Sequence, residues 1–293
     1  MTDPAAFIRF EHDGWARVAE GYHRFFSPVT GQVIEPLLDA AHVATGVTVL
    51  DVATGPGGLA ARAAAARGAS VIGVDIAEPV VALAAQLNPD LDFRCADAHD
   101  LSFADESFTA VVANFLLPHL GDHRAATAEM SRVLAPGGWL AVSTWDVPER
   151  AAVLGVVVAA VAEAGGAAPA HLPAGPAFFA YSDDEALVGL LRGAGLGEVE
   201  VRRLSFTHRV ASPDELWNGV LDGTVRTAAL VDSQPPDVRR RIRVAFDRLA
   251  AKYAVGTGLE LPVAVKIASG CRVDKDRGAT RSPGAGSLGS RRR

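Results

Sequence analysis

Apolar runs recur along residues 47–145, and each ends at a polar or glycine-rich break. Alternating or continuous apolar residues over such short lengths predict buried strands. The segments between them are alanine-rich or amphipathic and predict helices. This alternation is typical of a parallel sheet covered by helices on both faces. The expected strands are 47–53, 70–76, 91–96, 108–117 and 139–145, with helices at 59–67, 79–87 and 125–134.

The residues before 47 and after 145 show other patterns. Residues 13–41 show helical spacing, broken at Pro28 and Gly31, and two further strands are expected late in the chain. The fold class expected is therefore α/β, with a mostly parallel seven-stranded sheet, helices on both faces and helical insertions that form a lid. The later elements are helices at 151–164, 182–192, 213–222 and 236–253, and strands at 198–210 and 261–268.

These elements predict five segments. The last of them is rich in Gly, Ser, Pro and Arg, a composition that cannot bury a core and predicts disorder. The segments are N-terminal helices at 1–45 that cover a ligand, a core at 46–146, a helical lid segment at 147–181, the second half of the core at 182–270 with a helical insertion at 212–254, and a basic tail at 271–293.

A glycine-rich turn follows the first expected strand, in the sequence Val49-Leu-Asp-Val-Ala-Thr-Gly-Pro-Gly57. A strand, a glycine turn and a helix together let a ligand lie against bare backbone at the helix N-terminus. Asp75 ends the next strand, 18 residues beyond Gly57. A carboxylate at this spacing can accept hydrogen bonds from both ribose hydroxyls of an adenosine ligand. The pattern predicts a site for such a ligand.

Composition and charge narrow the class of protein. The chain has 293 residues, of which 49% are hydrophobic and 21% charged, enough to bury a full core. Residues 271–293 hold seven basic and two acidic residues, a net of +5, and because the chain total is −6 the remainder carries −11. So acidic a body disfavours nucleic acid as a partner. Two cysteines make neither a disulfide framework nor a metal site, and no apolar run approaches the ~20 residues that span a membrane. With no visible secretory signal, a cytoplasmic enzyme is expected.

With these motifs in this order, the sequence resembles the class I S-adenosylmethionine-dependent methyltransferases, nearest the quinone-biosynthesis (UbiE-like) small-molecule enzymes. The resemblance covers residues 10–145 and, more loosely, the chain to 269. It implies a Rossmann-like fold and S-adenosylmethionine as the cofactor. Ala53 stands where many members have glycine, which should narrow the cofactor groove slightly. The residues it implies are Asp51, Ala53, Gly55 and Gly57 at the methionine moiety, Asp75 and Ile76 at the ribose, Asp97 and Ala98 in Cys95-Ala-Asp-Ala98 at the adenine, and the turn Leu134-Ala-Pro-Gly-Gly138 before strand five.

The acceptor side is less defined. Tyr22 either packs in the core or closes over the cofactor, and Asn114 begins the loop after strand four, at the sheet edge where such ligands bind. On that loop His119 is the candidate catalytic base, with a structural cap of the following helix as the alternative. The expected acceptor is a small apolar or aromatic molecule methylated at oxygen or carbon. The residues expected either to line its site or to pack the lid are Val153, Val156, Val157, Phe178, Phe179 and Trp217.

Two other functions compete with this interpretation. The run Gly55-Pro-Gly57-Gly-Leu-Ala60 also fits the G-x-G-x-x-A pattern of an NAD(P)-dependent oxidoreductase. Asp51 and Asp97 have no counterpart in that pattern and favour the methyltransferase. The other alternative is a non-catalytic interaction module on the same scaffold. The partners expected are a small-molecule acceptor, with no nucleic acid and no membrane, and the sequence leaves open a homodimer.

Overall fold

One twisted sheet organises the protein, whose computed structural model describes residues 3–273. Within that range the main sheet has the order β3-β2-β1-β4-β5-β8-β6, and the two-residue strand β7 pairs with β8. Strands β1 to β5 pair in parallel, whereas β8 is antiparallel to both β5 and β6. The expected mostly parallel, seven-stranded α/β sheet is confirmed. The strands are β1 Thr48–Val52, β2 Ser70–Asp75, β3 Asp92–Cys95, β4 Phe108–Ala113, β5 Leu134–Trp145, β6 Leu196–Val210, β7 Ala254–Val255 and β8 Gly258–Arg272.

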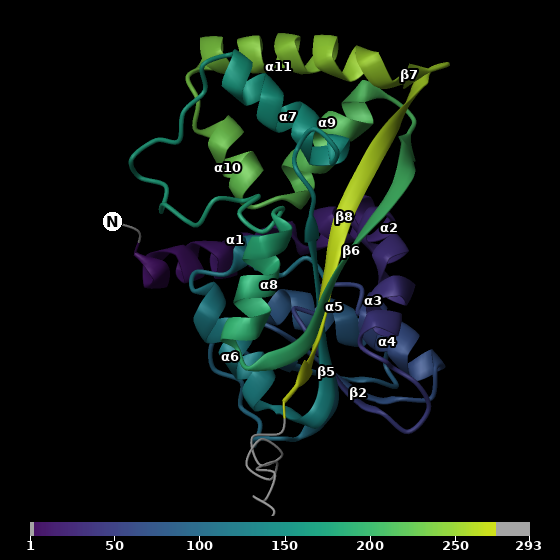
Figure 1. Ribbon diagram of the computed structural model, residues 1–293. Helices are drawn as coiled ribbons and strands as arrows, with labels where there is room; N and C mark the ends of the chain where they lie inside the picture. The colour runs from purple at the N-terminus through teal and green to yellow at the C-terminus, as the bar shows by residue number, and fades with distance from the viewer. Residues whose placement is uncertain (1–2, 274–293) are drawn as a thin grey trace, which may run out of the picture.

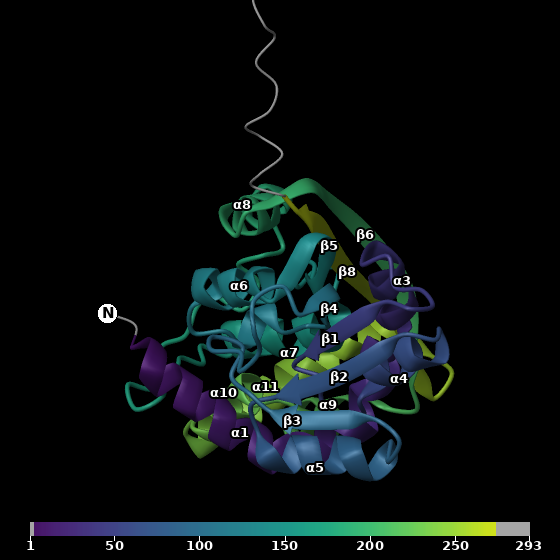
Figure 2. The same cartoon turned by 90° about the horizontal axis from the view of Figure 1, so that it is seen from below.

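Helices cover both faces of this sheet (Figure 2), and the strand residues alternate between the two apolar layers. Val49 packs into the layer under α3 (Ile34–Ala40) and α4 (Leu59–Ala66), whereas its neighbour Leu50 packs into the layer under α6 (His123–Arg132) and α8 (Asp184–Gly193). Both residues are fully buried. Adjacent strand residues point to opposite faces, so a central strand covered on both sides must be apolar throughout. This explains the continuous apolar runs of the sequence.

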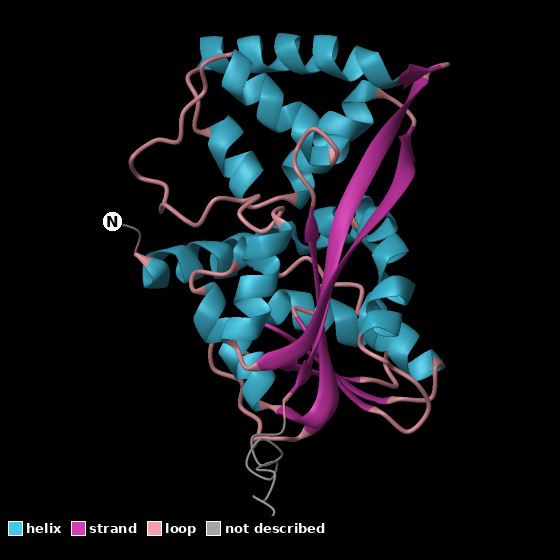
Figure 3. Ribbon diagram, viewed as in Figure 1, coloured by secondary structure: helices cyan, strands magenta, loops and turns pink. Residues whose placement is uncertain are grey.

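A helical cap lies beyond the C-terminal edge of the parallel strands. Trp145 at the end of β5 pairs with Val265, but β6 and β8 continue to pair as far as Val210 and Leu259. These two long strands therefore rise past the sheet to the cap (Figures 1 and 3). The cap consists of α7 Ala152–Glu163, α9 Pro213–Gly223, α10 Arg226–Asp232 and α11 Pro236–Ala250.

The first helix, α1 (Pro4–Phe25), lies between the cap and the sheet and packs closely on α9. A Cβ atom added to Gly21 would stand 2.1 Å from the carbonyl oxygen of Asp222, and one added to Gly14 would stand 2.2 Å from Val225 Cγ1. No side chain fits at either place, so Gly21 sets how closely α1 approaches α9, and Gly14 how closely it approaches Val225 at the start of α10. On its other side α1 packs against α5 (Glu78–Leu87) through Ala19.

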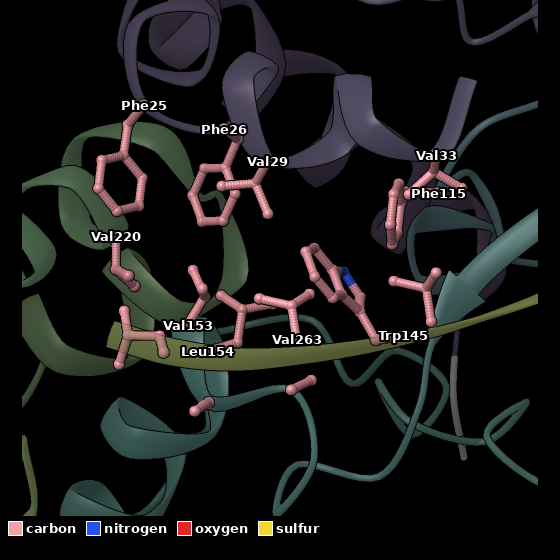
Figure 4. Packing of buried hydrophobic residues seen from close by; sticks show 14 of the residues in the cluster. Phe25, Phe26, Val29, Val33, Phe115, Trp145, Val153, Leu154, Val220 and Val263 are labelled. Atoms are coloured by element: carbon pink, nitrogen blue, oxygen red, sulfur yellow. The ribbon is translucent and has the colours of Figure 1, made fainter. Parts of the chain in front are cut away.

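The chain after α1 enters the core through aromatic side chains. Phe25 and Phe26 meet edge to face with ring centroids 5.1 Å apart. Figure 4 shows both rings directed toward Val153 and Val220 of the cap. They belong to the larger core cluster, which joins the cap helices to one face of the sheet. Short helices α2 Ser27–Thr30 and η1 Gly31–Val33 then lead into α3.

Several expected boundaries were wrong. Helix α1 begins at Pro4 rather than at residue 13, with Asp3 Oδ1 accepting the Ala6 N–H at 3.1 Å as its N-cap. The expected turn before strand five lies inside β5, where residues 135–138 bulge opposite Thr109 alone. A Cβ on Gly138 would stand 2.8 Å from the Thr109 carbonyl oxygen, which accounts for glycine there.

The end of the chain also differs from expectation. The last strand runs to Arg272, so Cys271 and Arg272 belong to β8 and not to a disordered tail. Arg272 Nη1 donates to the carbonyl oxygen of Arg132 at 3.0 Å, which ties the strand to the end of α6. Residues 274–293 of the expected tail lie outside the described residues. Helix α10 was missed, because seven residues are too few for a clear helical period.

Candidate functional site

A cleft of about 770 Å³ opens where β1, β2 and β4 end, beneath α1. In open parallel sheets this edge is where ligands bind. Of the ten candidate cofactor residues, eight from the resemblance and Tyr22 and Asn114 from their places in the chain, eight line this cleft and the other two line an adjoining pocket, so the fold gathers the whole set. The eight are Tyr22, Ala53, Gly55, Asp75, Ile76, Asp97, Ala98 and Asn114, and the two are Asp51 and Gly57.

The glycine-rich turn takes a left-handed backbone at two of its residues. Gly55 has φ +67°, and Ala53 has φ +57°, which is unusual for a residue with a Cβ atom. Gly57 has little room, since an added Cβ would lie 3.2 Å from His23 Nδ1. Ala53 was expected only to narrow the groove. The structure adds that it occupies a strained conformation, of the kind that clusters at ligand sites.

Asp75 is bound to the turn it faces. Its Oδ2 accepts the backbone N–H of Gly55 at 3.1 Å, and its Oδ1 accepts that of Ala77 at 3.3 Å. Only 8% of the residue is exposed. Burial raises the pKa of Asp75 to about 6, although these backbone N–H groups oppose the rise. A carboxylate has about four acceptor positions, so Asp75 keeps acceptor capacity toward the cleft.

Asp51 lies inside β1, directly beneath the turn. Its Oδ2 accepts the Thr54 hydroxyl at 2.7 Å and the Ala61 N–H at 3.0 Å, which fixes the turn to the start of α4. Its Oδ1 is buried and has no hydrogen-bond partner among the described residues. Burial raises the pKa of Asp51 to about 7, with a smaller contribution from the nearby Asp75 charge. A buried acceptor without a partner is costly, which suits a site completed by a ligand donor.

Asp97 is held by a histidine that the sequence analysis did not single out. His99 donates its backbone N–H to Asp97 Oδ1 at 2.9 Å, and its Nδ1 lies 2.6 Å from the same oxygen. His99 Nε2 accepts the backbone N–H of Asp122 at 3.2 Å, so the ring proton must be on Nδ1. This contact lowers the pKa of Asp97. His99 thereby links the expected adenine acid to Asp122, the N-cap of α6.

Asn114 and Tyr22 both line the cleft and both contact Thr30. The Asn114 amide donates to the Thr30 carbonyl oxygen at 3.2 Å and accepts the Ser143 hydroxyl at 2.6 Å. The Tyr22 hydroxyl lies 3.5 Å from Thr30 Oγ1. Burial raises the pKa of Tyr22 to about 12, which keeps the phenol protonated. Of the two roles open to Tyr22, its place in the wall of the cleft favours the ligand-facing one.

A second pocket of about 380 Å³ adjoins the cleft under the cap. The two spaces share four lining residues: Trp15, Tyr22, Phe115 and His119. Trp145 also lines the second pocket, its ring centroid 4.3 Å from that of Phe115 (Figure 4). Of the apolar residues expected to line the acceptor site or pack the lid, only Phe178 lines a described pocket, and the others pack into or against the core: Val153, Val156, Val157, Phe179 and Trp217.

His119 ends the short helix η2 (Leu117–His119) and lies in the wall between the two pockets. Its Nδ1 is 2.9 Å from Glu11 Oε2. The alternative role as a cap of the next helix is wrong, because Asp122 caps α6. Glu11 was missed by the sequence analysis. Trp15, which lies on the same helix, lines both pockets. A glutamate on a leading helix carries no local signal that it will meet a loop more than a hundred residues away.

Among residues 3–273 no helix combines the length and apolarity that crossing a membrane requires. In the same range no cluster of three or more His, Cys, Asp or Glu side chains is arranged to hold a metal ion.

Comparison with known proteins identifies relatives of this chain. A family model described as a methyltransferase domain matches residues 50–142, a segment that begins within β1 and ends within β5. A demethylmenaquinone methyltransferase of Clavibacter sepedonicus is 32% identical over 171 residues, 55% of this chain and 69% of that protein. One of Renibacterium salmoninarum is 38% identical over 112 residues, 38% of this chain, so the match spans only 47% of that relative.

Solved structures share the architecture at lower identity. The YcgJ protein of Bacillus subtilis superposes with a TM-score of 0.55 at 18% identity, over 83% of this chain and 99% of that protein. At this identity the likeness concerns the fold alone.

Proposed function

Because the chain belongs to the class I S-adenosylmethionine-dependent methyltransferases, we propose that it transfers a methyl group from that cofactor to a small apolar or aromatic acceptor, at oxygen or carbon. The observation that carries the proposal is the common wall of the two pockets. The cleft with the predicted cofactor residues and the aromatic pocket beneath the cap meet at Tyr22, Phe115 and His119. Because the two spaces share these lining residues, reactants bound in them would lie next to each other there.

The residues of the cleft fit the cofactor at each of its parts. Asp51 has a buried acceptor oxygen available for the ammonium of an amino acid, directly or through water. Asp75 can accept the ribose hydroxyls, and the second carboxylate oxygen of Asp97 can accept the adenine amine beside the Ala98 backbone. Gly55 has no atom within 4 Å of where a Cβ would lie, which leaves its backbone open to a ligand.

The cofactor supplies a methyl group on a positively charged sulfur, already activated for transfer. The chain's own residues then have to align the acceptor with that methyl group and exclude water. Holding two reactants in line can lower a barrier by several kcal/mol, up to about 7–11 kcal/mol in the best intramolecular models. The cap supplies this confinement, with Phe178 and Trp145 among the walls of the acceptor pocket.

His119 is the proposed base where the acceptor loses a proton. A positioned base contributes about 10²–10⁴-fold to a rate. We therefore expect His119→Ala to lower kcat at least about a hundredfold on a hydroxyl acceptor, with cofactor affinity nearly unchanged. The fall in rate at low pH, which protonation of the imidazole would cause, should be absent from His119→Ala. A loss below about fivefold with that fall at low pH intact would leave alignment alone as the catalytic effect.

The proposal is tested by calorimetry and by methyl transfer. The purified chain should bind S-adenosylmethionine or S-adenosylhomocysteine and should prefer both to NAD and NADP. A screen of phenols and hydroxylated naphthoquinones with methyl-labelled cofactor then identifies acceptors. Preferential binding of a nicotinamide cofactor would overturn the assignment, and cofactor binding without transfer to any acceptor would favour a non-catalytic module.

A further inference from the structure

Glu11 is a buried acid that no cofactor role accounts for. It lies on α1, is 3% exposed and faces the cleft. Its Oε2 accepts the Trp15 indole N–H at 3.1 Å and lies 2.9 Å from His119 Nδ1, whereas its Oε1 is buried without a partner among the described residues. Burying a carboxylate costs several kcal/mol, so such a group persists where another function requires it.

The contacts assign the proton on His119. The Trp15 N–H can only donate, which makes Glu11 Oε2 an acceptor, and an ionised glutamate can likewise only accept. His119 Nδ1 must therefore carry the ring proton and donate it to Glu11, which leaves Nε2 with its lone pair. Within residues 3–273 Nε2 has no hydrogen-bond partner, while the ring lines both pockets.

Aromatic rings fix the plane of the imidazole. Trp15 meets the His119 ring edge to face with centroids 4.9 Å apart, and Phe178 meets it in the same way at 6.0 Å. The ring can then neither tilt nor turn without losing these contacts. Both the tautomer and the direction of Nε2 are set before an acceptor arrives.

We propose that Glu11 is a positioning residue that makes His119 a base for an acceptor hydroxyl, so that the acceptor is an alcohol or a phenol. This rests on the proposed methyl transfer. The hydroxyl oxygen forms a bond to the methyl carbon as the carbon–sulfur bond breaks, and that electron pair stays on sulfur. The hydroxyl proton moves to His119 Nε2 and later leaves to water. Glu11 remains ionised throughout and stabilises the imidazolium across the Nδ1 hydrogen bond.

The competing account makes the same contact a latch that holds α1 over the cleft. The other charged groups that act here are Asp75, which interacts with the His119 charge, and Arg226, which interacts with that of Glu11. The Arg226 guanidinium donates to the carbonyl oxygens of Pro118 and Pro176 and lies over the Phe178 ring, so it stays in place when Glu11 is changed. A latch would depend on the presence of a hydrogen bond, whereas a positioned base depends on the charge.

Glu11→Gln separates the two accounts because glutamine keeps the size and an oxygen acceptor but loses the charge. Glu20→Gln, an exposed change on the same helix, is the matched control. In ¹⁵N NMR of histidine-labelled protein bound to S-adenosylhomocysteine, with His119→Ala to assign the signal, we expect the Nδ1–H tautomer in the parent and in Glu20→Gln. In Glu11→Gln the titration midpoint of His119 should move to lower pH. An Nε2–H tautomer in the parent, or an unmoved midpoint in Glu11→Gln, would overturn the proposal.

Turnover gives the second readout, with 1-naphthol as the probe phenol. We expect Glu11→Gln to lower kcat about 10–100-fold, to leave KM within about threefold, and to shift the low-pH limb of the rate to lower pH. A kcat like that of the parent, with the limb in place, would indicate the latch, because glutamine keeps the hydrogen-bond acceptor. Transfer only to carbon or nitrogen acceptors would refute the hydroxyl assignment while leaving methyl transfer intact, and failure to bind S-adenosylhomocysteine would refute the proposed function itself.

Discussion

The backbone N–H of Gly55 donates to Asp75 Oδ2 over 3.1 Å, which joins two motifs that lie 20 residues apart in sequence. The acid at the end of β2 thereby holds the turn at the end of β1, and the turn in turn fixes the direction of the carboxylate. Neither group has to reorganise when a ligand enters. Such preorganisation reduces the cost of binding.

Replacing Asp75 should weaken cofactor binding in two ways: the turn is held less firmly, and the ribose hydroxyls lose a charged acceptor. In Asp75→Asn one oxygen acceptor remains, but the charge and the fork to the ribose hydroxyls are lost. Charge-assisted hydrogen bonds contribute about 1.5–3 kcal/mol each, so affinity for S-adenosylhomocysteine should fall about 10–100-fold by calorimetry. Asp90→Asn, an exposed aspartate after α5, should bind as the parent does. Equal affinity in Asp75→Asn would exclude the ribose role.

Cofactor binding should also depend on pH through Asp75, because its pKa lies at about 6 and only the ionised form accepts from both hydroxyls. Affinity should hold above pH 7 and decline as the pH falls through about 6. Once the Asp75 carboxyl is protonated in the free protein, the affinity should fall by close to tenfold for each further pH unit. Calorimetry from pH 5 to 8 measures this, and the slope should be absent in Asp75→Asn. A slope that survives the substitution would assign the titration to another group.

Asp51 should make stability fall as pH rises. Its pKa is about 7 in the folded chain against 3.8 for an unperturbed aspartate, so between these values the folded state holds a proton that the unfolded chain has lost. The free energy of unfolding should therefore decline from about pH 4 to pH 7, by up to roughly 1.4 kcal/mol for each unit, and then level off. Urea unfolding of the parent and of Asp51→Asn tests this. The same decline in both would show that Asp51 does not cause it.

Gly21→Ala should separate α1 from α9. The new methyl group would meet the Asp222 carbonyl oxygen, and overpacking of this kind costs about 1–3 kcal/mol. Gly189→Ala in α8 is the matched control, because nothing lies within 4 Å of its added Cβ and a helical glycine costs about 0.5–1 kcal/mol relative to alanine. Urea unfolding should show destabilisation in the first and stabilisation in the second. Equal shifts would mean that the close approach is not limiting.

The strands that could be predicted are those whose own residues show them to be buried strands. Val49 to Val52 is apolar apart from Asp51, and any central strand of a covered sheet must be so. The start of α1 was missed because the apolar face of its first turns is partnered by residues distant in sequence. Gly175, for example, lies so close to Phe7 that an added Cβ would stand 2.1 Å from the ring.

The site residues likewise divide into those that the local sequence predicts and those that it does not. Gly55, Asp75 and Asp97 follow strands directly, so strand order alone brings them to one edge. Glu11 and His99 act through contacts between separate segments, which no local pattern encodes. For the lid residues the sequence left two roles open, because an apolar side chain on a cap helix can face either the pocket or the core, and composition does not distinguish the two.

The glycine contacts of α1 with α9 have a kinetic consequence. Helix α1 roofs the cofactor cleft, and α9 belongs to the cap that covers the acceptor pocket, yet at Gly21 and Asp222 their backbones touch. Neither helix can therefore move far from its pocket unless the other moves with it. With the proposed function, we expect the exit of the demethylated cofactor and that of the methylated product to share one opening motion, whose frequency would limit the number of turnovers per second.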